Sequence, residues 1–202
     1  MKTKLIVTST GFALATLAAF SVHAAAELTA FQLAQEGNRY VGEQARDKVV
    51  QIRSEKSVGS LTPNVWFVVY YDSTASLKAT EVKFGSGKML AVTRPLRLLE
   101  PVSGGDAPLN REKLKVDSDA ATRTALNEPL LQNLKLVATQ LKLERVGQGV
   151  FGQSGPGEPV WKVKLWAAKS QEPSHQADLG EIWVSASDGK VVKNDLHPER
   201  AG

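Results

Sequence analysis

Cysteine is absent from the 202 residues of this chain, and histidine occurs only three times. Without cysteine there can be no disulfide framework, no thiolate zinc site, no cysteine nucleophile and no lipidated cysteine behind a leader. The fold must therefore be held together by its apolar core, which the 42% of hydrophobic residues can supply.

Catalytic signals are equally scarce. The chain contains no HExxH, no GxSxG and no GxxxxGK[ST] motif. Apart from His23 near the start of the chain, the histidines are His175 in "EPSHQAD" and His197 in "DLHPERAG". Both lie in polar stretches, where histidine is usually solvated. The glycine-rich "VGQGVFGQSGPGEP" (146–159) is interpreted as a hairpin loop, since a dinucleotide fingerprint requires a turn that opens a helix. We therefore expect no catalytic, metal-binding or cofactor-binding residue and no cofactor.

Basic residues form no run that could follow a phosphate backbone. Lys2 and Lys4 lie in a segment that we expect to be removed. Without them 23 of the 25 basic residues remain against 21 acidic ones, a net charge of +2. We expect no nucleic-acid partner.

The start of the chain, "MKTKLIVTSTGFALATLAAFSVHAAAELTA", has the order of a secretory signal peptide. Two lysines precede an apolar run from Leu5 to Val22, and an alanine cluster follows. A membrane anchor is the alternative, but serine, threonine and glycine dilute the run. We expect a signal peptide over 1–24 with cleavage after Ala24 or Ala26. The mature protein would then be periplasmic or secreted, without a stable membrane anchor.

A pattern recurs on the two sides of the connector "RPLRLLEPVSGGDAPLNREK" (94–113). A shift of 91 residues places Ile52 on Leu143. Further along, "PNVWFVVYY" (63–71) aligns with "EPVWKVKLW" (158–166), and the "GK" of "SGKMLAV" aligns with that of "DGKVVKN". The sequence therefore predicts one structural unit used twice.

Each copy is expected to hold a helix followed by strands. Apolar spacing predicts helices over 27–41 and 120–134, the second capped by Asp117, Ser118 and Asp119 and kinked or restarted at Pro129. The turns Ser86-Gly87 and Asp188-Gly189 suit positive backbone angles and predict hairpins. The predicted fold class is α+β with two repeated units, each a helix packed on a three- to four-stranded antiparallel sheet. The units would cover 25–95 and 115–202, with a linker over 96–114.

This order of elements resembles the PepSY domain, most closely in "KVDSDAATRTAL" (115–126), "EPVWKVKLW" (158–166) and "IWVSASDGKVV" (182–192). The family usually shows an Asp where this chain has Ser185, and the first copy matches only as a diverged partner. The resemblance implies a non-catalytic module outside the cytoplasm that modulates or inhibits a secreted or envelope peptidase.

Strand alternation predicts one unusual surface. In "VWKVKLW" the residues Trp161, Val163 and Leu165 face one side, and lysines face the other. The equivalent outer side of "VWFVVYY" is apolar, so we expect it to be covered. One interpretation is that the second unit covers it, with the two sheets packed face to face or joined edge to edge with the linker over them. The other is that a partner protein or peptide covers it. The candidate protein-contact residues are Phe67, Val69, Tyr71, Trp166 and Trp183.

Three functions remain open from the sequence. The first is an exported PepSY-like binding protein that acts on a protein or peptide, with a peptidase as the expected partner. The second is a structural or assembly protein of the cell envelope that forms a homodimer through the apolar sheet face. The third is a small hydrolase with an unrecognised site, which would be expected to lose activity when His175 or His197 is replaced by alanine.

Overall fold

The computed structural model describes residues 28–95, 108–146 and 157–202. The strands are β1 (Val49–Ser54), β2 (Val65–Tyr71), β3 (Ala79–Gly85), β4 (Lys88–Thr93), β5 (Leu136–Val146), β6 (Glu158–Ala168), β7 (Gln176–Ser185) and β8 (Val191–Leu196). The helices are α1 (Ala30–Gly37) and α2 (Ser118–Leu126), with short 3-10 turns at Arg111–Lys113, Pro129–Leu131 and Pro198–Ala201. The predicted signal peptide, residues 96–107 of the predicted linker and residues 147–156 of the glycine-rich stretch lie outside the described residues.

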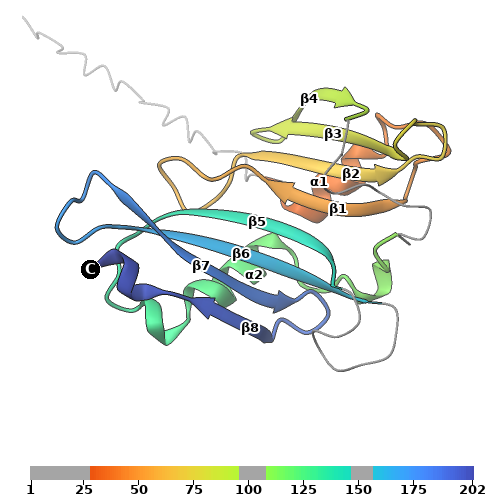
Figure 1. The fold of residues 1–202 in the computed structure, drawn as a ribbon. Helices are drawn as coiled ribbons and strands as arrows, with labels where there is room; N and C mark the ends of the chain where they lie inside the picture. Colours follow the sequence, from red (N-terminus) through yellow and green to blue (C-terminus); the bar gives the residue numbers. More distant parts are fainter. Residues whose placement is uncertain (1–27, 96–107, 147–156) are drawn as a thin grey trace, which may run out of the picture.

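The eight strands of the described residues belong to one antiparallel sheet with the order β4-β3-β2-β1-β5-β6-β7-β8 (Figure 1). The expectation of two repeated units, each with a helix on its own sheet, is therefore wrong. β1 pairs with β5 through Ile52–Leu143 and Arg53–Lys142, which makes the sheet continuous. A face-to-face packing of two sheets is excluded for the same reason. Sequence patterns identify strands and hairpins, but they do not show which strand edges will meet.

The β1–β5 junction is extended by serine side chains. Beyond the two ladder pairs, the Ser54 hydroxyl accepts a hydrogen bond from the backbone N–H of Leu141 at 2.9 Å. The Ser57 hydroxyl accepts one from the N–H of Thr139 at 2.9 Å, and the Ser57 N–H donates to the Thr139 carbonyl at 2.8 Å. Buried backbone groups that have left the ladder thus keep partners, which burial requires.

Both helices lie on the same face of the sheet, α1 against β1 and β2 and α2 against β6 and β7 (Figure 1). α1 begins later than predicted because Thr29 forms a capping box with Gln32 just before its first turn, and it ends earlier than predicted, at Gly37. Asp117 caps α2 as predicted. That helix ends before Pro129, which opens a separate 3-10 turn, because proline cannot continue the hydrogen-bond ladder.

The core lies between the helices and the inner face of the sheet. Trp161, Val163 and Leu165 are fully buried there, as the alternation predicted. Their counterparts on β2 are Trp66, Val68 and Tyr70, and each of these residues is at most 5% exposed.

The two predicted hairpin turns are present. Ser86 and Gly87 have φ of 47° and 75°, and they join β3 to β4. In the turn between β7 and β8, Gly189 has φ of 76°.

Candidate protein-contact surfaces

The five predicted contact residues all lie on the helix-free face of the sheet, but they do not form one patch. Phe67, Val69 and Tyr71 lie on β2, whereas Trp166 is on β6 and Trp183 is on β7. Strands β1 and β5 run between the two groups. The structure therefore divides the five candidate residues into two groups.

Val69 is fully buried in this face, within a small cluster formed by Val50, Tyr71 and Ala79. The apolar outer side of β2 is thus partly covered from within the chain. Val69 cannot contact a partner unless this cluster opens.

Three of the four aromatic rings among the five predicted contact residues, those of Phe67, Trp166 and Trp183, each have two cations over them. Arg53 and Lys83 lie 4.0 and 5.0 Å from the centre of the Phe67 ring. The cations over Trp166 are Lys56 at 4.3 Å and Lys164 at 5.3 Å, and those over Trp183 are Lys162 at 4.4 Å and Lys193 at 4.9 Å. Each such contact contributes about 0.5–1 kcal/mol at an exposed site. The faces of these three rings therefore already contact cations within the chain.

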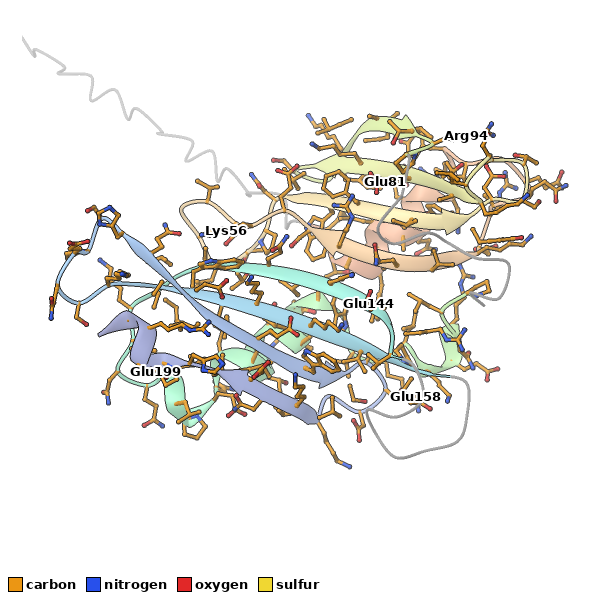
Figure 2. The ribbon with its side chains drawn as sticks, in the orientation of Figure 1. Lys56, Glu81, Arg94, Glu144, Glu158 and Glu199 are labelled. Carbon is orange, nitrogen blue, oxygen red and sulfur yellow. The ribbon has the colours of Figure 1, made fainter. Side chains whose placement is uncertain are left out.

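Charges of both signs lie on the helix-free face: Glu81 is on β3, Glu144 is on β5, and Lys56 lies in the segment that follows β1 (Figure 2). Glu144 bonds to Lys142 and Lys162, both at 2.8 Å, and accepts a hydrogen bond from the Gln51 amide at 3.1 Å. Burial by itself raises the pKa of Glu144, but the two lysines outweigh it and hold the pKa below its ordinary value. Glu144 thereby links β1, β5 and β6.

Both predicted histidines are paired with carboxylates. His175 Nδ1 lies 2.7 Å from Glu172, and His197 lies 3.2 Å from Glu199 and 3.7 Å from Asp195. These are exposed pairs close in the chain. Within residues 28–95, 108–146 and 157–202, no group of three or more histidine and acidic side chains is arranged to hold a metal ion.

A cleft of about 270 Å³ lies on the helix side, between α1, α2 and the β3–β4 turn. Its apolar wall includes Leu33, Trp66 and Leu141, and its rim includes Asp119 and Arg123, which pair with each other at 2.9 Å. Ligand pockets for drug-sized molecules usually measure about 300–1,000 Å³. The volume of this cleft lies just below that range.

The two outer strands of the sheet differ in how they are protected. On β8, Lys193 and Asp195 pair with each other, and the Asn194 amide donates to Glu128 at 2.9 Å. The middle of β4 carries no charge. Its apolar side chains Met89, Leu90 and Val92 are 38%, 57% and 42% exposed.

Sequence reasoning missed the β4 edge. "KMLAVT" (88–93) is a short apolar strand whose only charge is Lys88. The signal was available, because the last strand of a meander is an edge unless another segment pairs with it.

Searches of protein-family models, curated proteins and solved structures found no match to this chain. The PepSY resemblance therefore stays a prediction from the quoted motifs. Neither α1 nor α2, the α-helices of the described ranges, has the length and hydropathy needed to cross a membrane.

Proposed function

We propose that this protein is exported and acts by binding an extended segment of a partner protein along the outer edge of β4, which no other strand of residues 28–95, 108–146 and 157–202 pairs with. The observation that carries the proposal is the exposure of Met89, Leu90 and Val92 on an outer strand without charge in its middle. The role is one of binding and not of catalysis.

An outer strand presents N–H and C=O groups that no neighbouring strand uses, and another chain can pair with them. Proteins usually protect such edges with charge, proline, bulges or a covering element. β8 follows this rule through Lys193 and Asp195. β4 is protected by Lys88 at its start and by a bulge in its pairing with β3, but its middle remains apolar. Of the two edges, β4 is the better site for strand addition.

The PepSY resemblance adds the kind of partner, since it implies a peptidase of the envelope or of the medium. The predicted signal peptide would bring the protein to the same compartment. A peptidase that presents an extended segment would fit both the partner implied by the resemblance and strand addition at β4. Phe67, Trp166 and Trp183 on the helix-free face support this less well, because cations already lie over their rings.

The proposal is tested by selecting binders from a random peptide display library on the protein from Ala25 to Gly202. Selected peptides are then measured against Val92→Lys and against Val192→Lys. These two valines have similar exposure, 42% and 37%, but lie on opposite edges of the sheet. A lysine on an edge disfavours strand addition, so we expect Val92→Lys to lose binding and Val192→Lys to keep it.

Both substitutions are at exposed positions, so each should change the free energy of unfolding by less than about 0.5 kcal/mol. Urea denaturation checks this before binding is compared. Selected peptides that bind Val92→Lys as well as the parent, or no selected peptide at all, would refute the proposal.

A further inference from the structure

We propose that the segment added to β4 runs antiparallel to it, alternates apolar with polar side chains, and carries an acidic side chain opposite Lys88. This inference rests on the proposed function and specifies its partner. It follows from what lies on each side of β4 and at its beginning.

The helix side of β4 offers an apolar shelf, formed by Tyr40, Met89 and Val92. Met89 lies opposite Phe84 and Val92 opposite Val82, and both of these β3 residues belong to the core on the helix side. Tyr40 packs edge-on against the same Phe84, with the ring centres 6.4 Å apart. All three shelf residues are at least 37% exposed. Side chains of an added strand that point to this side would be buried against the shelf.

The other side of β4 is polar from Ala91 to Thr93, whereas Leu90 covers it beside Gly85. Ala91 lies opposite Lys83 and Thr93 opposite Glu81, and these charged residues occupy the helix-free face. Lys83 is paired with Glu55 at 3.0 Å, and Glu81 with Arg53 at 2.8 Å. Side chains pointing to this side remain near water and charge. Since residues of a strand alternate between faces, the added segment should alternate apolar with polar residues.

Leu90 sets the local shape of the edge. It is the extra residue of the bulge between Met89 and Ala91, and a side chain at Gly85 would meet it, because an added Cβ there would lie 2.6 Å from the Leu90 Cδ1. Leu90 thus occupies the space that Gly85 leaves open. Because the bulge interrupts β4, only a short run of its backbone groups can pair regularly with an added strand.

Lys88 supplies the charge. It is exposed, and no hydrogen bond or ion pair of its side chain occurs among the described residues. At the other end of the strand, Arg94 already lies 3.4 Å from Asp72. Antiparallel pairing is slightly more stable per residue than parallel pairing and continues the pattern of this sheet. An antiparallel segment ends beside Lys88, so its acidic residue belongs at its C-terminal end.

The experiment is a fluorescence anisotropy titration of the protein from Ala25 to Gly202 with labelled synthetic peptides. The first peptide alternates valine with threonine and ends in a glutamate amide. Matched peptides carry lysine in place of the glutamate, carry the glutamate at the other end, or shuffle the same composition. We expect the first peptide to bind best, and its advantage over the lysine peptide to be about two- to fivefold, as for an exposed ion pair.

A charge reversal makes the test specific. Lys88→Glu should invert the order of the glutamate and lysine peptides, and salt should reduce the difference. Lys190→Glu, an exposed site in the β7–β8 turn, is the control and should leave the order unchanged. Val92→Lys should weaken all the peptides.

The outcomes separate the two proposals. If peptides bind at β4 but the shuffled peptide or the lysine peptide binds as well as the first, the pattern is wrong and the proposed function stands. If no peptide binds in a way that Val92→Lys abolishes, both fail. Light scattering that grows with protein concentration without peptide, and that Val92→Lys abolishes, would assign the edge to a second copy of this chain and overturn the inference.

Discussion

Removing the Asp117 side chain should destabilise the protein through two helices at once. One Asp117 carboxylate oxygen accepts a hydrogen bond from the Ser118 N–H at 2.6 Å and caps α2. The same carboxylate accepts from the Phe31 N–H, at 3.1 and 3.3 Å to its two oxygens, in the first turn of α1. The Ser118 hydroxyl accepts from the Ala30 N–H at 3.1 Å. The starts of the two helices are therefore held by one acidic side chain and its neighbour.

The expected cost follows from these two bonds. Loss of an N-cap side chain costs about 1 kcal/mol, and a hydrogen bond to a charged acceptor contributes about 1.5–3 kcal/mol. We expect Asp117→Ala to lower the free energy of unfolding by about 2–4 kcal/mol. Asp117→Asn should recover most of this, because asparagine caps helices about as well as aspartate.

Urea denaturation followed by tryptophan fluorescence measures the effect. Trp161 reports on this region, since it stacks on Phe31 at 6.0 Å and donates its indole N–H to the Val116 carbonyl at 2.8 Å. The control is Asp119→Ala in the first turn of α2, where only an exposed pair with Arg123 is lost. That change should cost about 0.5 kcal/mol. The reasoning is refuted if Asp117→Ala costs no more than Asp119→Ala.

Two further predictions concern the sheet. Glu144→Gln should lower the free energy of unfolding at neutral pH, because the two lysine partners are only 26% and 23% exposed. Folding lowers the pKa of Glu144, so its contribution to the free energy of unfolding is complete above the ordinary carboxyl pKa and is lost as the pH falls through the pKa of the folded state. In urea titrations the free energies of unfolding of the parent and of Glu144→Gln should therefore become more similar below about pH 4. Gly180→Ala should cost more than about 2 kcal/mol, because Gly180 has φ of 96° and an added Cβ would lie 2.1 Å from the backbone oxygen of Asp195. Gly42→Ala, where an added Cβ meets nothing within 4 Å, should be nearly neutral in the same assay.

Local features of the fold could be predicted from the sequence because they depend on neighbouring residues. Alternation in "VWKVKLW" identified the buried side of β6, and Asp117 identified the start of α2. The Ser86-Gly87 turn follows from the need for positive φ at both positions. Each of these depends on a few consecutive side chains.

Pairing between distant strands could not be predicted in this way. Nothing local shows that β1 and β5 will meet, or that Ser54 and Ser57 will bond to backbone groups of β5. The exposure of the candidate contact residues could not be predicted for the same reason. Whether an apolar outer face is exposed depends on which strands flank it, and Val69 proved fully buried.

The sparse β1–β5 junction has a kinetic consequence. Ile52 and Leu143 pair directly although they are 91 positions apart, whereas β3–β4 and β7–β8 close through short turns. Hairpins form in about 1–10 μs, but long-range pairing first has to overcome the entropy of closing a large loop. The outer hairpins should therefore be present early, and joining β1 to β5 should limit the folding rate. Weakening the serine bonds at this junction would then slow the assembly of the sheet without slowing the hairpins.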